Sequence, residues 1–450
     1  MNRIRGAKKA LYTAYMLFFG SGQISRRYRY LYRWQTSDEE FRRRERDRIF
    51  RHLFQFAFER VPFYTKLYLR EGLKPADIRS LKDMDKIPLV SREMLKMADP
   101  SDLKPRGSFL YPLVSRFTSG SSGQPLQFYK SLDGLLFNAA QFLIYLDMWG
   151  LSDTRRVFFA LFNTDPTTSI NFPYSWHLSI YNKNHSVHPE DNVAEVARKI
   201  LEGQPDLVVT YPSVLERLCD YLLEAGGECP RKMMFATGGE TQSPALIRKI
   251  KAIFPEGDIF NIYNTEEAGM IAVECPYHQG MHVNNFAVVL EKGESVSIGE
   301  EMTFKPIITN LRKYGTPFIR YTGIEDTLFE ASVPYCHSHL GAQAIKKIEG
   351  RISDFIYTSD GSSYPVIFLM DVHSSIEGIH RFQYKQTSPQ EFTICYVAKK
   401  GADELDLNNQ IEASSRKILG NNITIKSKKV TNLYIDPSSQ KTPLIIKRQL

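Results

Sequence analysis

The chain has 450 residues, of which 42% are hydrophobic and 24% are charged, with five scattered cysteines and a formal net charge of +8. These values are typical of a globular protein with about three structural units, and they exclude a disordered or collagen-like chain. The odd number and scatter of the cysteines argue against a disulfide framework and favour the cytoplasm, and no apolar run approaches the roughly 20 residues of a membrane-spanning helix.

The positive charge is concentrated at the N-terminus. Residues 1–51 hold fourteen Lys or Arg against five Asp or Glu, so the rest of the chain is close to neutral. A general nucleic-acid binder more often spreads its charge over a folded face, so nucleic acid is not an expected partner. The apolar stretch at residues 11–19 is short and no clear Ala-x-Ala site follows it, which argues against a cleaved signal peptide.

Two interpretations of the N-terminal arm, residues 1–35, stay open. The arm is either an amphipathic segment packed on the body, or a peripheral anchor whose arginines contact anionic headgroups at the inner face of the membrane. After the arm, Ser37 and Asp38 lie where a helix N-cap is expected, and a loose helical periodicity continues to about Arg60.

The central part of the chain predicts an α/β fold with largely parallel sheets. Short apolar runs that indicate buried strands alternate there with helical stretches. The strands are expected at residues 157–162, 207–210 and 233–237, and the helices at 193–201 and 213–224. Residues 286–330 contain further short strands, which we expect to form a small barrel-like region.

A domain boundary is predicted near Gly350 and Arg351. The residues beyond it have β and α signals of their own, with strands expected at 382–384, 391–398 and 423–430 and a helix at 407–419. We therefore expect a large multi-subdomain region at residues 36–350 and a small, mobile α+β domain at residues 351–450, joined by a hinge.

The most informative segment is a Ser/Gly-rich loop that follows a predicted strand at residues 110–114. Glycines let the backbone fold closely around an anion, and successive N–H groups and hydroxyls then donate to phosphate oxygens. The common phosphate loop Gly-x-x-x-x-Gly-Lys-Ser/Thr is absent, and a flexible linker is the alternative. The loop consists of Thr118, Ser119, Gly120, Ser121, Ser122 and Gly123, before Gln124 and Pro125.

Other polar groups follow predicted strands. Gly239 and Glu240 come after one strand, and the segment from Tyr263 to Gly269 follows another. A tyrosine at a strand end is able to stack on a purine, and a nearby carboxylate is able to hold Mg²⁺ on phosphates. Asp326 is placed to accept hydrogen bonds from ribose hydroxyls. Tyr263 and Glu267 also have simpler explanations, because a tyrosine here is compatible with a core aromatic residue and a glutamate with a solvated surface charge.

Taken in order, these motifs resemble those of the AMP-forming adenylate enzymes. The closest branch is the phenylacetate–CoA ligase-like proteins, including their homologues in capsular polysaccharide loci. The resemblance runs from about residue 35 to residue 450. The motifs that carry it are residues 118–125, 263–269, Arg320-Tyr321 with Asp326, Gly350-Arg351 and Lys441, joined by Val61-Pro-Phe-Tyr64 and Lys86-Ile-Pro-Leu89 in the N-terminal region.

The resemblance implies a two-step reaction in which ATP and a carboxylic acid form an acyl-adenylate and pyrophosphate, and a nucleophile, usually the CoA thiol, then displaces AMP. It assigns the triphosphate to residues 118–123, with Gly239, Glu240, Asn264 and Thr265 also in the nucleotide site. Tyr263 is assigned to adenine, Glu267 to Mg²⁺, Asp326 to ribose, and Arg351 to ribose or phosphate. Lys441 is assigned to the reacting carboxylate and the α-phosphate, closing onto the site as the small domain rotates.

The chain departs from the family pattern at several positions. Gln124 stands where many relatives have lysine, Asn264 replaces a common glycine, and Glu266 replaces a common threonine. Ser353 takes the place of a frequent hinge aspartate, and Gln440 replaces the glycine usually found before the terminal lysine. A degenerate ligase fold, acting as a membrane- or nucleic-acid-associated binding protein, is therefore the competing interpretation.

A structural zinc ion is also predicted. Cys275 and His278 form one C-x₂-H pair, and Cys336 and His339 form a second, a spacing that suits tetrahedral Zn²⁺. Family relatives often carry cysteine and histidine in these two regions. A buried thiol with surface histidines is the alternative. The identity of the acid and of the final acceptor is left open, because CoA, an amine, a sugar amine and a carrier thiol all remain compatible with the sequence.

Overall fold

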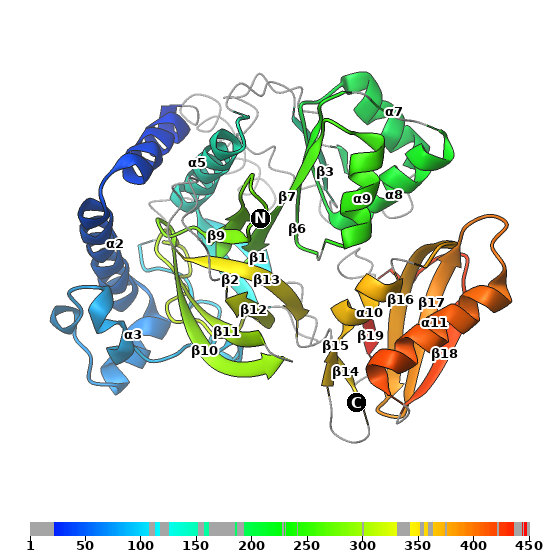
Figure 1. Cartoon of the computed structure of the whole chain (residues 1–450). Coiled ribbons are helices and arrows are strands. Elements are labelled where there is room, and N and C mark those ends of the chain that lie inside the picture. The colour runs from blue at the N-terminus through cyan, green and yellow to red at the C-terminus, as the bar shows by residue number, and fades with distance from the viewer. Residues whose placement is uncertain are drawn as a thin grey trace, which may run out of the picture. The chain divides into compact units, whose positions relative to one another are not determined.

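The computed structural model of the chain describes residues 22–107, 113–117, 126–151, 157–161, 185–186, 193–226, 229, 231–240, 242–298, 301–330, 343–351, 355–358, 363–373, 376–420, 423–435, 443 and 445–447. The chain divides into two compact units, which are described separately (Figure 1). Unit 1 comprises Met1–Arg155, Asn171–Ile180 and Ile262–Lys347. Unit 2 comprises Arg156–Ile170, Tyr181–Asn261 and Ile348–Leu450.

The helices of unit 1 begin where the sequence supplies N-caps. Asp38 accepts a hydrogen bond of 2.6 Å from the backbone N–H of Phe41 and thereby starts α2, as expected. Glu39 and Glu40 occupy the first turn, where negative charge complements the helix dipole. The helical elements of this region are α2 (Glu39–Arg60), α3 (Pro62–Arg70), the 3₁₀ turns η1 (Pro75–Asp77) and η2 (Leu81–Lys86), α4 (Arg92–Met97) and α5 (Leu132–Met148).

Residues 22–36 of the arm form a helix that packs on unit 1. Ile24, Leu31 and Trp34 are buried, and the Trp34 ring lies 5.6 Å from that of Phe286 in an edge-on contact. The phenol of Tyr28 donates to a carboxylate of α5. The apolar side chains of this part of the arm therefore pack on the body, whereas Arg26, Arg29 and Arg33 are exposed. Residues 1–21 lie outside the described residues, and among the described ones no helix is long and apolar enough to cross a membrane.

The strands of unit 1 form an open sheet. Its order is β10-β11-β12-β13-β9-β8, and β8 pairs antiparallel with the end of β7. We expected a barrel-like region here, but the sheet does not close. Within the described residues β10 is an edge strand that pairs with β11, and β12 pairs with β13 and not back to β10. The strands are β7 (Asp258–Thr265), β8 (Gly269–Glu274), β9 (Met281–Val283), β10 (Val288–Ile298), β11 (Glu301–Asn310), β12 (Asp326–Glu330) and β13 (Ala344–Arg351), beside a hairpin of β1 (Leu113–Phe117) and β2 (Gln127–Ser131). Residues 348–351 of β13 belong to unit 2.

Unit 2 contains the predicted parallel sheet. Its strands follow the order β6-β5-β3-β4 and pair parallel throughout. Val208 and Phe235 of the sheet share a core with Leu215 and Ile250 of the helices, which are green in Figure 1. The elements are β3 (Val157–Leu161), β4 (His185–Ser186), α7 (Val193–Gly203), β5 (Leu207–Thr210), α8 (Pro212–Glu224), β6 (Met234–Gly238) and α9 (Pro244–Ile253). β7 begins in unit 2 and ends in unit 1.

The C-terminal part of unit 2 has the α+β structure that its sequence predicts. A four-stranded sheet of order β18-β17-β16-β19 has its own core, which includes Tyr384, Phe392 and Ile411. Asp403 caps the longest helix of this part. The elements are β14 (Phe355–Tyr357), β15 (Ser363–Pro365), α10 (Val366–His373), β16 (Ile379–Ser388), β17 (Glu391–Ala398), α11 (Glu404–Leu419), β18 (Thr424–Lys429) and β19 (Ile445–Lys447). The hinge and the domain boundaries at residues 35 and 350 stay predictions.

Candidate active site

The motif from Tyr263 to Gly269 includes the tight turn between β7 and β8. Thr265 pairs with Gly269 across the hairpin, and the Thr265 hydroxyl accepts a hydrogen bond of 2.9 Å from the backbone N–H of Ala268. Gly269 has a φ of 72°, in the left-handed region that favours glycine. Asn264 is exposed and Thr265 is half-buried. The turn therefore presents Glu266 and Glu267 at the end of a buried strand.

Tyr263 and Asp326 are in direct contact, although 63 positions separate them. The Tyr263 hydroxyl donates a hydrogen bond of 2.6 Å to Oδ2 of Asp326, the first residue of β12. Only 6% of Tyr263 is exposed. The structure thus brings together the residue assigned to adenine and the residue assigned to ribose, and the tyrosine fixes the orientation of the carboxylate.

Glu267 is buried beside an arginine that the sequence did not single out. Its Oε1 lies 3.2 Å from a terminal nitrogen of Arg92, and each side chain is 10% exposed. Burial raises the pKa of Glu267, because the ionised form loses its hydration, while Lys313 and Arg92 act in the opposite direction. Glu267 is therefore a carboxylate whose charge depends on cations supplied by this chain.

Two side chains, those of Lys313 and Asn310, donate hydrogen bonds to backbone carbonyls of the turn between β7 and β8. The Lys313 ammonium donates to the carbonyl oxygens of Glu266, at 2.8 Å, and of Glu267, and Asn310 donates to the carbonyl oxygen of Ala268. The Lys313 ammonium also lies 4.6 Å from the ring centres of two phenylalanines. Burial lowers the pKa of Lys313 well below its usual value. These donors satisfy three successive carbonyls and fix the turn.

The second carboxylate of the turn has a cation of its own. The Lys130 ammonium lies 2.6 Å from Oε2 of Glu266, and its charge holds the pKa of Glu266 below the usual value. Glu266 is exposed, in contrast to its neighbour. The exposed and the buried carboxylate are therefore neutralised separately, the first by Lys130 of β2 and the second by Arg92 of α4.

Gly239 and Glu240 lie in unit 2 and are described by themselves. Gly239 is exposed with a φ of 76°. Oε2 of Glu240 accepts a hydrogen bond of 3.0 Å from the backbone N–H of Ser213, in the first turn of α8. A carboxylate at a helix N-terminus is favourable, so Glu240 ties the loop after β6 to that helix. Its assignment to the nucleotide site stays a prediction.

Several predicted residues lie outside the described part of the chain. These are the six residues of the Ser/Gly loop, Thr118 to Gly123, together with Cys336, His339 and Lys441. Arg351 is the last residue of β13, and its side chain is not described.

The described half of the predicted zinc site is arranged around a turn. Cys275 is buried, and the backbone N–H of His278 donates to its carbonyl oxygen at 2.9 Å. The His278 imidazole contacts Glu274 through Nδ1 at 2.8 Å. Within the described residues no three His, Cys, Asp or Glu side chains are grouped as metal ligands. Because Cys336 and His339 are not described, the zinc site stays a prediction.

A magnesium site needs fewer protein ligands than a structural zinc site. Mg²⁺ is usually held by one or two carboxylates and by substrate phosphates, and not by an all-protein cage. A single buried carboxylate on a fixed turn at a strand end fits that mode. Glu267 is therefore suited to hold a magnesium ion together with a nucleotide.

Comparisons with known proteins agree with the motifs. No protein-family model matches the chain. A segment of 91 residues is 35% identical to the phenylacetate–coenzyme A ligase of Thermus thermophilus, and it covers 19% of this chain and 19% of that enzyme. The match thus spans about a fifth of the length of that relative.

Solved structures resemble the chain over a much greater length. The structure of 2-hydroxyisobutyryl-CoA ligase with an acyl-AMP, in the postadenylation state, has a TM-score of 0.74 at 15% identity and covers 93% of this chain and 92% of its own. O-succinylbenzoate coenzyme A synthetase from Bacillus subtilis, in complex with AMP, has a TM-score of 0.51 at 14% identity and covers 73% of this chain and 67% of its own. The chain therefore has the fold of the AMP-forming adenylate enzymes, as its motifs predicted.

Proposed function

We propose that this protein is an AMP-forming ligase that activates a carboxylic acid with ATP and transfers the acyl group to CoA. The observation that carries the proposal is the contact of Tyr263 with Asp326, because both residues are assigned to the nucleoside and they meet in an adenylate-forming fold. The turn that carries Glu267 directly follows Tyr263 in the sequence.

In the first step, a carboxylate oxygen of the acid attacks the α-phosphorus of ATP. An acyl–O–P bond forms, the bond to the bridging oxygen breaks, and pyrophosphate leaves with its electron pair. Two anions must meet, so the site has to supply positive charge and hold an in-line geometry. Mg²⁺, when bound, neutralises phosphate charge. In the second step the CoA sulfur attacks the acyl carbon, the thiol proton is lost, and AMP leaves.

The described residues support binding and orientation. By resemblance to the family, Tyr263 is assigned to adenine, and Asp326, held by the Tyr263 hydroxyl, is assigned to the ribose hydroxyls. Glu267 provides the carboxylate for the magnesium ion. The Ser/Gly loop, Arg351 and Lys441 are assigned to the phosphates by resemblance to the family, and these assignments are part of the proposal.

The acceptor and the pathway are narrower proposals. CoA is favoured because the similar enzymes are CoA ligases by name. An amine, a sugar amine or a carrier thiol would attack the same acyl carbon. Use of the product in surface polysaccharide biosynthesis is consistent with the branch that the motifs resemble.

Pyrophosphate exchange against a panel of carboxylic acids tests the activity. We expect label to enter ATP with at least one acid, and Asp326→Asn to reduce this exchange. Glu330→Gln is the matched control, because Glu330 lies at the other end of β12 in an exposed pair with Lys292. If the protein bound adenine nucleotide but exchanged pyrophosphate with no acid, a degenerate ligase fold would be the better interpretation. Loss of exchange in both variants would contradict the role of Asp326.

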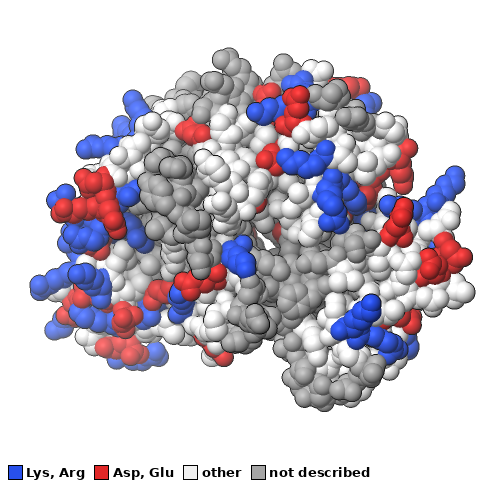
Figure 2. Space-filling model, in the orientation of Figure 1, with Lys and Arg blue, Asp and Glu red and all other residues white. Residues whose placement is uncertain are grey.

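We also propose that the arm contacts anionic lipid at the cytoplasmic face of the membrane, where ATP is present. Arg26, Arg29 and Arg33 are exposed at helical spacing on the arm. The basic residues of α2 are weaker candidates, because Arg43, Arg44 and others pair with neighbouring carboxylates. On the face drawn in Figure 2, Lys and Arg over the N-terminal helices are interspersed with Asp and Glu. Vesicle flotation tests this, and equal binding to neutral and anionic vesicles would contradict it.

A further inference from the structure

The buried carboxylate of Glu267 is neutralised by an arginine of the same chain. Arg92 and Glu267 lie 175 positions apart, yet their charged atoms are 3.2 Å from each other and both side chains are 10% exposed. A buried charge without a partner is strongly unfavourable, so the guanidinium offsets part of the cost of burying this carboxylate. Glu267 is also the carboxylate that we assign to magnesium.

The other cations around the turn have different partners. Lys130 contacts the carboxylate of Glu266, and Lys313 donates to the backbone carbonyls of Glu266 and Glu267. Arg92 is the cation whose side chain contacts the Glu267 carboxylate itself.

Arg92 is positioned by a well-anchored segment. The Ser91 hydroxyl caps α4 by accepting from the backbone N–H of Met94 at 3.2 Å. Just before it, Val90 forms a β-bridge with Tyr321, in which the backbone N–H of Val90 donates to Arg320 at 3.0 Å. Arg92 is therefore anchored by the hydrogen bond that caps α4 and by the β-bridge just before it.

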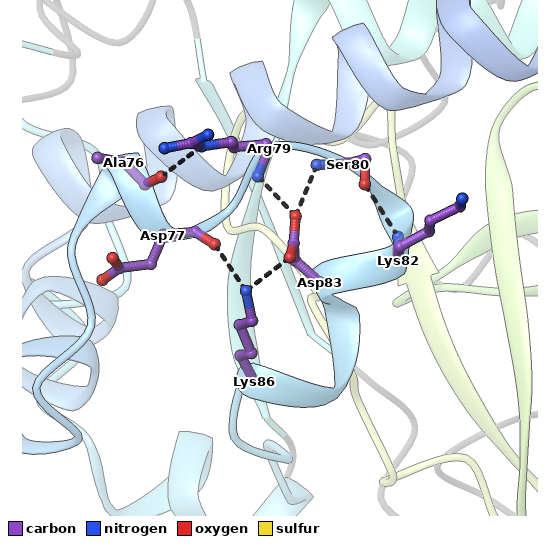
Figure 3. A network of polar contacts seen from close by, with 7 residues as sticks. All are labelled: Ala76, Asp77, Arg79, Ser80, Lys82, Asp83 and Lys86. Atoms are coloured by element: carbon purple, nitrogen blue, oxygen red, sulfur yellow. Dashed lines mark hydrogen bonds and ion pairs between the residues drawn. The ribbon is translucent and has the colours of Figure 1, made fainter.

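The preceding 3₁₀ segment is fixed by a carboxylate at its centre (Figure 3). Asp83 accepts from the backbone N–H groups of Arg79 and Ser80 at 2.9 and 3.1 Å, and its other oxygen accepts from Lys86 at 2.6 Å. The Lys86 ammonium and these N–H groups hold the pKa of Asp83 at about 2. Lys86, the first residue of the Lys86-Ile-Pro-Leu89 motif, thus helps to fix the segment that precedes Arg92.

We infer that Arg92 is a resident counter-ion that competes with Mg²⁺ for the carboxylate of Glu267. In the nucleotide-free protein the guanidinium occupies Oε1, and loading of the magnesium nucleotide releases it. Arg92 is a positioning residue in this scheme, because it acts through Glu267. The inference rests on the proposed function, since the ion is expected to arrive with ATP.

The test measures binding of α,β-methylene-ATP to the full chain by calorimetry at increasing Mg²⁺ concentrations. Arg92→Met removes the competing charge, and we expect the Mg²⁺ concentration for half-maximal binding to fall about tenfold. Arg92→Lys keeps the charge and is expected to remain close to wild type. Lys249→Met is the matched control for losing a buried cation, because Lys249 pairs with Asp220 at 2.6 Å in unit 2. It is expected to leave the midpoint unchanged.

The possible outcomes separate the two proposals. Wild-type protein that binds no analogue at any Mg²⁺ concentration overturns the proposed function and this inference with it. Wild-type binding with an unchanged or higher midpoint in Arg92→Met overturns the inference alone. If Arg92→Met does not fold, Arg92→Gln keeps hydrogen-bond donors without the charge and must show the same fall. A urea-unfolding cycle of Arg92→Met, Glu267→Gln and the double variant, without nucleotide, must show coupling between the two residues.

Discussion

The C-terminal part of unit 2 is expected to lose stability in mild acid because it buries a neutral histidine. His373 ends α10 and is fully buried. Its Nδ1 lies 2.9 Å from the Tyr384 hydroxyl and its Nε2 lies 3.0 Å from the Ser415 hydroxyl, so both ring nitrogens have hydrogen-bond partners. Burial lowers the pKa of His373 from 6.5 to about 4. Folding therefore favours the uncharged ring.

The sign and size of the effect follow from linkage. A histidine with a lowered pKa in the folded state contributes its full stability above the unfolded pKa of about 6.5, and this contribution is lost progressively as the pH falls from about 6.5 to about 4. One pKa unit corresponds to about 1.4 kcal/mol, so the whole contribution is about 3 kcal/mol, of which about 2 kcal/mol is lost by pH 5. This loss matters for function because Lys441, the predicted catalytic lysine, belongs to the same part of the chain.

Hydrogen exchange of peptides from α10 and α11, read by mass spectrometry between pH 8 and pH 4, measures this local stability. We compare the wild type with His373→Gln, which retains hydrogen-bonding groups but does not titrate. After correction for intrinsic exchange, the wild type should lose about 2 kcal/mol more than the variant between pH 8 and pH 5. Parallel pH profiles for the two proteins would refute the assignment of this acid sensitivity to His373.

Three further predictions concern the candidate site. Tyr263→Phe removes the hydrogen bond to Asp326 and should weaken AMP binding in calorimetry about 5- to 10-fold, and unchanged affinity would contradict the pairing. Lys313→Met leaves buried carbonyls of the turn without a donor and should lower the free energy of unfolding in urea by about 1–3 kcal/mol per carbonyl, whereas an unchanged value would show that water replaces the ammonium. Lys441→Ala should reduce pyrophosphate exchange by about 10²- to 10³-fold and spare the consumption of supplied acyl-adenylate, and an equal loss in both half-reactions would show that the lysine is wrongly assigned.

Local sequence patterns were sufficient to predict most elements. Asp38 marks the start of α2, and the strand expected at residues 391–398 corresponds to β17. These features depend on neighbouring residues, because a cap or an alternating strand is defined within a few positions. The ordered motifs likewise indicated the adenylate-forming fold, because their residues and their order resemble those of that family. One of the short strands expected within residues 286–330, at residues 318–321, is an exception: Tyr321 forms only isolated bridges, to Val90 and Ile308, because its partners come from distant segments.

The sequence by itself determined the elements, the order of the motifs and the candidate residues Tyr263, Glu267 and Asp326. Only the tertiary structure decided which groups meet. Arg92 is the first residue of a short helix, 175 positions from Glu267, and Lys313 lies in a basic loop, 46 positions from Glu267. Neither residue has a local sequence signal that predicts its contact with the turn. Such contacts arise because a buried carboxylate and buried carbonyls require partners, and the fold supplies them from whichever segment passes nearby.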